Sequence, residues 1–112
     1  MKKIEAIIRP AKLDILIDRL EDIGISGMNI FEVRGYGSQK GHEEMYRGVT
    51  YRIRLREKIR VELVINDDLV DEVVKTIVET AKTGSVGDGK IFITAIEDAV
   101  RIRTGEKGEK AL

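Results

Sequence analysis

The amino-acid sequence predicts an α+β domain in which strands and helices follow the order βαββαβ. The spacing of apolar residues switches between the two-residue period of a strand and the longer period of an amphipathic helix. The first half of the chain also resembles the second half: when the two are aligned, Glu5 matches Glu62 and Asp14 matches Asp71. Its 112 residues, 42% of them apolar, suffice for one core without disulfides and are too few for a second domain. We therefore expect residues 1–112 to form a single domain.

The first half of the chain contains a strand, a helix and a second strand. Residues 3–9 alternate, with Ile4, Ala6 and Ile8 on one side, until Pro10 ends the strand. Apolar residues then recur at helical spacing up to Gly24, which favours a helix end. Residues 28–34 predict the second strand. The helical stripe consists of Leu13, Leu16, Ile17, Leu20 and Ile23.

The second half repeats this order. Residues 51–65 predict a strand, and Asp67 or Asp68 is expected to cap the helix that follows. That helix ends near Gly84, and residues 90–96 predict the last strand. The apolar stripe of the helix consists of Val70, Val73, Val74, Ile77, Val78 and Ala81.

A doubled βαβ unit of this size is typical of the ferredoxin-like fold, a four-stranded antiparallel sheet with both helices on one face. The opposite face would carry Ile7, Val64 and Phe92. A face this apolar is not expected to stay in water, so we predict that oligomerisation covers it.

Composition excludes several classes of function. The 20 basic and 20 acidic residues cancel, which argues against nucleic-acid binding through overall charge. The chain has no cysteine, and its single histidine, His42, cannot complete a catalytic or metal-binding set alone. The apolar run from Ala6 to Ile8 is far too short for a signal peptide or a membrane span. We expect a cytoplasmic protein that is neither an enzyme nor inserted into a membrane.

Residues 84–90 are a candidate anion site. They match the G-x-x-x-x-G-K core of a phosphate-binding loop, but Ile91 replaces the Ser or Thr that such a loop uses for Mg²⁺. The segment also follows a helix and opens a strand, the reverse of a P-loop, which excludes a P-loop NTPase. Closely spaced glycines still let backbone N–H groups converge on an anion beside Lys90. The alternative is a glycine-rich connection with a surface lysine.

Residues 100–105 are a second candidate. In an extended backbone Arg101 and Arg103 would share one face, and two parallel guanidinium groups suit a polyphosphate. The alternative is a solvated, charged edge that discourages strand aggregation.

A long polar stretch, residues 35–50, separates the two halves and shows no apolar periodicity. Loops longer than about 12–15 residues in compact domains are usually functional or disordered. We predict a recognition loop here.

Five motifs in this order resemble the PII signal-transduction proteins of nitrogen control, nearly end to end. The resemblance implies a ferredoxin-like homotrimer with one ATP or ADP site in each cleft between subunits. It also implies a non-enzymatic sensor of nitrogen, carbon and energy status that binds 2-oxoglutarate together with Mg-ATP. The motifs are KKIEAIIRP (residues 2–10), GYGSQKGH (35–42), YRGVTY (46–51), TGSVGDGKIF (83–92) and RIRTGE (101–106).

Carried over residue by residue, the resemblance implies that Arg101 and Arg103 reach the phosphates from the neighbouring subunit. It implies a Mg²⁺ ion that bridges the ATP phosphates, Gln39 and 2-oxoglutarate, whose far carboxylate meets Lys58. Because Mg²⁺ prefers phosphate and carboxylate oxygens, the metabolite should need ATP already in place. The implied ATP or ADP residues are Ile7, Asn29, Gly35, Gly37, Ser38, Gln39, Glu62, Val64, Gly87, Asp88, Gly89, Lys90, Arg101 and Arg103. The implied 2-oxoglutarate residues are Arg9, Gln39, Lys40, Gly41, Lys58 and Gly87.

The long loop resembles the T-loop of the family, here residues 35–56, and residues 98–112 resemble its C-terminal extension. The implied partners of the T-loop are ammonium transporters and enzymes of nitrogen metabolism. Arg47 matches an arginine that family members place in an ammonium channel, and Tyr51 a residue that some branches modify with a nucleotidyl group. A transporter would recruit the protein to the membrane peripherally.

Three alternatives stay open on the sequence. A divergent PII-like sensor would bind adenine nucleotides without responding to 2-oxoglutarate. An acylphosphatase-like enzyme would use Arg9 for phosphate, but residues 10–12 lack the glycine that its phosphate loop needs. An RNA-recognition motif needs exposed aromatics on its central strands, and residues 59–65 contain none.

Overall fold

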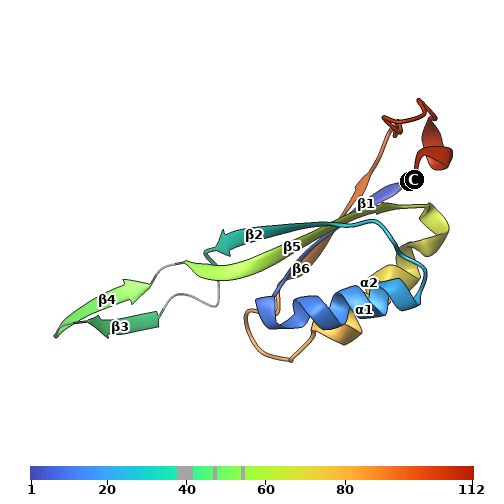
Figure 1. The fold of residues 1–112 in the computed structure, drawn as a ribbon. Helices are drawn as coiled ribbons and strands as arrows, with labels where there is room; N and C mark the ends of the chain where they lie inside the picture. The colour runs from blue at the N-terminus through green and yellow to red at the C-terminus, as the bar shows by residue number, and fades with distance from the viewer. Residues whose placement is uncertain (38–41, 47, 54) are drawn as a thin grey trace.

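The computed structural model of the chain describes residues 1–37, 42–46, 48–53 and 55–112. These residues form two sheets, two α-helices and three short 3₁₀ turns (Figure 1). The strands are β1 (Lys2–Ile8), β2 (Asn29–Gly35), β3 (His42–Tyr46), β4 (Val49–Ile53), β5 (Arg56–Ile65) and β6 (Lys90–Ala95). The α-helices are α1 (Leu13–Asp22) and α2 (Val70–Ala81), and the 3₁₀ turns are Pro10–Lys12, Asp67–Leu69 and Gly108–Ala111.

The larger sheet of the described chain has four strands in the order β2-β5-β1-β6, and each neighbouring pair is antiparallel. Helices α1 and α2 lie side by side on one of its faces (Figure 1). The predicted βαββαβ order and ferredoxin-like layering are therefore confirmed.

The core lies between this sheet and the two helices. In the central strand, Ala6 is fully buried and stands opposite Val61 on one side and Ile91 on the other. The alternate residues of β1 and β5 point to the helices because successive side chains of a strand face opposite ways. The core consists of Ile4, Ala6, Ile8, Leu16, Leu20, Ile25, Ile59, Val61, Leu63, Ile65, Val73, Ile77 and Ala81.

The stretch from residue 35 to residue 50 is not the structureless loop that we predicted. It contains β3 and the start of β4, which form a hairpin that projects away from the main sheet (Figure 1). Tyr46 pairs with Val49, and Gly48 adopts a φ of 77°, a conformation that suits a tight hairpin turn. The predicted strand 51–65 is correspondingly two strands, since β4 ends at Ile53 and β5 begins at Arg56. Strand β3, with the sequence HEEMY, has no apolar alternation, so periodicity did not reveal it.

The predicted capping of the second helix by Asp67 or Asp68 is wrong. The chain enters α2 through the 3₁₀ turn Asp67–Leu69, and neither that turn nor α2 has a side-chain cap. The Asp67 carboxylate instead accepts a hydrogen bond from the Met1 amino group, with 2.9 Å between nitrogen and oxygen. This bond and the positive charge of the amine lower the pKa of Asp67.

The sheet face opposite the helices carries the predicted Ile7, Val64 and Phe92, of which Phe92 is half exposed. Charged residues stand between them. The Arg60 guanidinium lies 4.2 Å from the centre of the Phe31 ring and 3.7 Å from a Glu5 carboxylate oxygen. The face is thus a mixture of apolar and paired charged groups. The predicted oligomer that would cover it stays a prediction.

Candidate functional site

A cavity of about 360 Å³ opens where the end of β2, the start of β5 and the connection between α2 and β6 meet the end of β1. One wall is the connection itself, residues 85–90, which we call the anion turn. The lining residues are Ile7, Gly35, Tyr36, Gly37, Arg56, Lys58, Ser85, Val86, Gly87, Asp88, Gly89 and Lys90.

Gly89 seats the anion turn directly on strand β1. Its φ is 99°, and a Cβ atom at this position would lie 1.6 Å from the Ile7 carbonyl oxygen. No other residue fits there, because a side chain would overlap the neighbouring backbone. The turn is therefore in backbone contact with the sheet at the edge of the cavity.

The Asp88 side chain braces the same turn. Its Oδ2 accepts hydrogen bonds from the backbone N–H groups of Thr83 at 2.8 Å and Gly84 at 2.9 Å. Its Oδ1 accepts a hydrogen bond from the Thr83 hydroxyl. The hydrogen bonds from Thr83 above all, with those from Gly84 and Arg9, hold the pKa of Asp88 well below its usual range. The carboxylate is thus ionised and fully engaged within its own chain.

Two cations reach the anion turn from the sheet. The Arg9 Nε donates to Asp88 Oδ1 at 3.1 Å, and its Nη2 donates to the Val86 carbonyl oxygen at 2.8 Å. The Lys58 Nζ donates to the Gly87 carbonyl oxygen at 2.6 Å. Partial burial, with the nearby guanidinium groups of Arg9 and Arg56, lowers the pKa of Lys58 from 10.5. This concentration of positive charge at the cavity favours an anionic ligand.

The structure gathers about half of the residues predicted to bind ligands. Ile7, Gly35, Gly37, Lys58 and residues 87–90 all line the cavity. Arg9 borders it through the contacts just described. Asn29 and Glu62 are paired neighbours on the open face of the sheet, and Val64 lies further along β5, outside the lining. Tyr51 pairs with Glu44 in the hairpin. The predicted Ser38, Gln39, Lys40, Gly41 and Arg47 lie outside the described residues.

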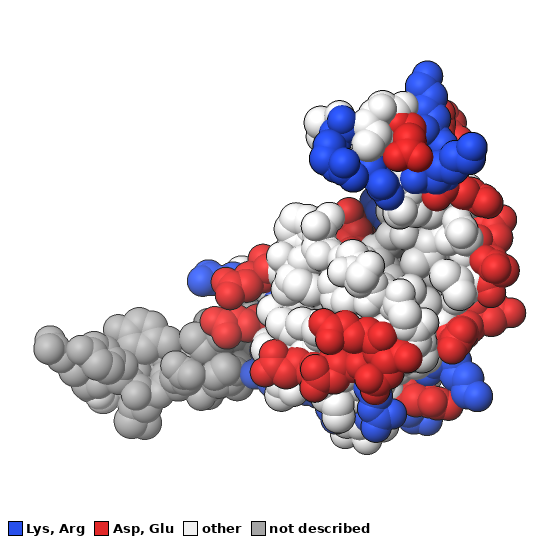
Figure 2. Space-filling model, turned by 45° about the vertical axis from the view of Figure 1, so that its right-hand side comes forward, with Lys and Arg blue, Asp and Glu red and all other residues white. Residues whose placement is uncertain are grey.

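Arg101 and Arg103 lie in the C-terminal segment, residues 98–112, which projects beyond the far end of β6 (Figure 1). The predicted extended backbone is wrong: Gly105 N–H bonds to the Arg101 carbonyl at 2.7 Å, and Val100 pairs with Lys107. Gly105, with a φ of 74°, closes this turn. Arg101 lies 3.6 Å from the Glu106 carboxylate and donates to the Leu112 carbonyl at 2.9 Å. Figure 2 shows Lys and Arg gathered on this segment.

Three residues of the site were missed. Tyr36 and Arg56 line the cavity, and Thr83 binds Asp88. The signal for Arg56 was available, because it is two residues from Lys58 on a strand and must share its face. The signal for Thr83 was its position before a glycine and five residues from an aspartate, a pattern of side-chain-stabilised turns.

The fold and the cavity define a small ferredoxin-like domain with Arg9, Arg56 and Lys58 gathered at a cavity on the edge of its sheet. Within the described residues, no helix is long and apolar enough to cross a bilayer. A family model described as "Nitrogen regulatory protein P-II" matches residues 1–106. The chain belongs to this family, whose members are signalling proteins and not enzymes.

Individual relatives agree along the whole chain. The nitrogen regulatory protein P-II of Haemophilus influenzae is 56% identical over 112 residues, which cover all of both chains. Nitrogen regulatory protein P-II 1 of Escherichia coli K12 is 50% identical with the same coverage. The crystal structure of Arabidopsis thaliana PII bound to citrate matches with a TM-score of 0.81 and 40% identity, covering 99% of this chain and 91% of that one.

Proposed function

We propose that this protein is a sensor that binds ATP or ADP and, with Mg-ATP, 2-oxoglutarate, and that it regulates ammonium transporters or enzymes of nitrogen metabolism through residues 35–56. It acts in the cytoplasm, as a homotrimer with its nucleotide sites between subunits. The alternative is a sensor of adenine nucleotides that does not respond to 2-oxoglutarate.

One observation carries this proposal: the anion turn and the segment with Arg101 and Arg103 lie at opposite ends of β6. The anion turn ends at Lys90, the first residue of β6, and the arginines follow Ala95, its last residue. The strand's six residues, at about 3.3 Å each, therefore separate the two segments by roughly 20 Å. A triphosphate is too short to touch both within one chain. Both segments can serve one ligand if Arg101 and Arg103 come from a second copy, which supports the trimer.

The chemistry of the anion turn supports a phosphate ligand. In the proposal the backbone N–H groups of residues 87–90 and the Lys90 ammonium group bind the phosphates, and Arg101 and Arg103 of the next subunit close over them. The base lies against Ile7 and Val64, near Asn29 and Glu62, on the open sheet face. Residues 35–39 lie against the nucleotide from the other side.

The cations at the cavity support a carboxylate ligand beside the nucleotide. In the proposal, 2-oxoglutarate binds at residues 39–41, Lys58 and Gly87. Lys58 then exchanges its bond to the Gly87 carbonyl for the far carboxylate of the metabolite. The related PII of Arabidopsis thaliana was crystallised bound to citrate, another carboxylate.

A magnesium ion fits this donor set. The described residues contain no group of three or more His, Cys, Asp or Glu that could hold a metal ion, and the Asp88 carboxylate is already engaged. In the proposal, Gln39 holds the Mg²⁺ ion together with oxygens of phosphate and 2-oxoglutarate, the ligands that this hard cation prefers. Bound there, the ion would supply positive charge that favours the phosphate and carboxylate oxygens together.

The projecting hairpin supports a role in partner recognition. It extends from the rims of the cavity, because β2 ends and β5 begins at residues that line it. A ligand at Gly37 or Arg56 thus touches the base of this arm. In the proposal Arg47 meets an ammonium transporter, and Tyr51 is a position for nucleotidyl modification.

A calorimetric titration of 2-oxoglutarate with Mg²⁺ in the presence of ATP, of ADP and of no nucleotide tests the function. We expect binding only with ATP. Binding of ATP without any binding of 2-oxoglutarate would establish the alternative sensor. Failure to bind either nucleotide would overturn both.

A further inference from the structure

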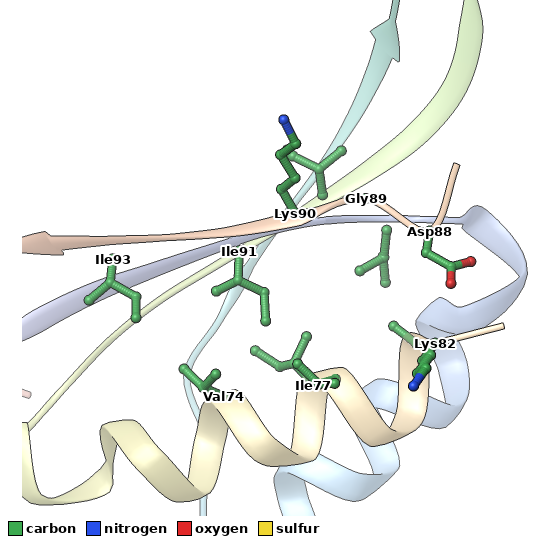
Figure 3. Close-up of a pocket in the computed structure, with 12 residues that line it drawn as sticks. Val74, Ile77, Lys82, Asp88, Gly89, Lys90, Ile91 and Ile93 are labelled. Carbon is green, nitrogen blue, oxygen red and sulfur yellow. The ribbon is translucent and has the colours of Figure 1, made fainter. Parts of the chain in front are cut away.

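The Asp88 carboxylate is the most heavily bonded side chain of the anion turn. It accepts from the Thr83 backbone, the Thr83 hydroxyl, the Gly84 backbone and the Arg9 guanidinium. Four donors on two oxygens leave little capacity for a ligand. Figure 3, the view of a neighbouring groove between α2 and β6, shows Lys90 and the Asp88 carboxylate on opposite sides of the strand.

Arg9 couples this brace to the sheet. It follows β1 directly, and its guanidinium binds the anion turn at two points, the Val86 carbonyl and the Asp88 carboxylate. The backbone of Gly89 meets Ile7 two residues earlier in the same strand. The end of β1 therefore fixes residues 86, 88 and 89, the backbone on which an anion would rest.

We propose that Arg9 and Asp88 are positioning residues, which together hold the anion turn in its ligand-receiving shape without contacting the ligand through their side chains. This inference rests on the proposed nucleotide function. The resemblance implied that Arg9 binds 2-oxoglutarate, whereas here the Arg9 side chain binds only the anion turn. Asp88 would contact the nucleotide through its backbone and not through its carboxylate.

The sign of one mutational effect distinguishes positioning from electrostatics. Asp88→Asn removes a negative charge beside an anion site, so electrostatics alone would make ATP bind more tightly. A positioning role predicts the opposite, because the amide accepts fewer bonds and loses the ion pair with Arg9. We expect ATP affinity, measured by calorimetry, to fall about tenfold.

Arg9→Gln should weaken ATP binding to a similar degree. The double variant Arg9→Gln/Asp88→Asn should be little weaker than either single variant, since both changes release the same turn. Asp18→Asn and Arg19→Gln, on exposed positions of α1, make the same charge changes away from the site and should leave affinity unchanged.

Thr83→Val provides a second variant without any charge change. It removes the hydroxyl that donates a hydrogen bond to Asp88 and should weaken ATP binding about threefold. In each variant, amide hydrogen exchange should speed up at Thr83 and Gly84 and stay unchanged in β1 and β5, which shows that the sheet remains folded.

Three results would overturn the inference while the wild-type protein binds ATP: equal or tighter binding by Asp88→Asn, additive losses in the double variant, or unchanged exchange at Thr83 and Gly84. If the wild-type protein binds no ATP, the proposed function fails instead. The exchange measurement needs no ligand and separates the two failures.

Discussion

The anion turn and the C-terminal segment, residues 98–112, are built in different ways. The anion turn is held by contacts within its own chain: Gly89 packs against the β1 backbone, and Lys58 donates a hydrogen bond to the Gly87 carbonyl. The C-terminal segment bonds mainly to itself, and its Ile102 side chain is fully exposed. The anion turn is therefore preformed without a ligand, whereas the C-terminal segment projects away from the rest of its own chain. A site that joins a preformed half to a projecting half from another copy would sense ligand and assembly together.

The largest difference between the two segments should be in the stability lost when a glycine in each is replaced by alanine. Gly89→Ala forces a Cβ atom into the Ile7 carbonyl and should destabilise the protein by roughly 3 kcal/mol or more, with loss of ATP binding. Gly105→Ala, at a positive φ with nothing within 4 Å, should cost only about 1–2 kcal/mol. Thermal unfolding measures both, and equal losses would contradict the comparison.

Next in size is the effect of the cation that faces the cavity. Lys58→Met should weaken 2-oxoglutarate binding by about ten- to a hundredfold, because one charge-assisted bond contributes roughly 1.5–3 kcal/mol. ATP affinity should change much less. Lys75→Met, on an exposed position of α2, serves as the control in the same titration. Unchanged 2-oxoglutarate affinity in Lys58→Met would remove Lys58 from the site.

A smaller effect is expected from the projecting half. Ile102→Ser should weaken self-association severalfold, because in the proposed oligomer this fully exposed side chain would be covered by another copy. Ile15→Ser, on α1 and 45% exposed, should not. Sedimentation across a dilution series measures the association. If the two variants associate alike, the segment does not dock through Ile102.

The smallest expected effect is the loss of stability at the anion turn when the pH is lowered and Asp88 becomes protonated. Because the folded-state pKa of Asp88 lies below its ordinary value of 3.8, its stabilisation is complete above pH 3.8 and is lost only as pH falls through the lower folded value. Carboxyl NMR should therefore give a titration midpoint for Asp88 well below 3.8, and the turn should persist at moderately acidic pH. A midpoint at or above 3.8 would show that the brace is absent in solution.

The sequence predicted the buried parts of this fold well, because periodicity reports burial. Ile4, Ala6 and Ile8 alternate since one side of β1 packs on the helices, and the helical stripes face the same core. Strand β3 was missed because its sequence, residues 42–46, shows no apolar alternation, and the predicted strand 51–65 included only residues 51–53 of β4. The helix start at Asp67 was misassigned because the carboxylate binds the Met1 amine, a contact with the far end of the chain that local capping rules do not include.

The candidate site was predictable where chemistry is local and not where it is long-range. Gly87, Gly89 and Lys90 stand out in sequence as an anion turn. The bonds from Arg9 to residues 86 and 88 join positions almost eighty residues apart, and spacing cannot reveal them. The arginines at 101 and 103 alternate as a strand would, but Gly105 turns the chain back on itself.

Mixing two defective chains tests most directly whether the site is shared between copies. Lys90→Gln damages only the anion turn, and Arg103→Gln damages only the projecting segment, so each variant alone should bind ATP weakly. In oligomers reassembled from equal amounts of both, about a quarter of the sites combine an intact turn with an intact segment. We predict that this fraction binds ATP with wild-type affinity in a calorimetric titration. Uniformly weak binding in the mixture would place both halves of the site in one chain and contradict the account.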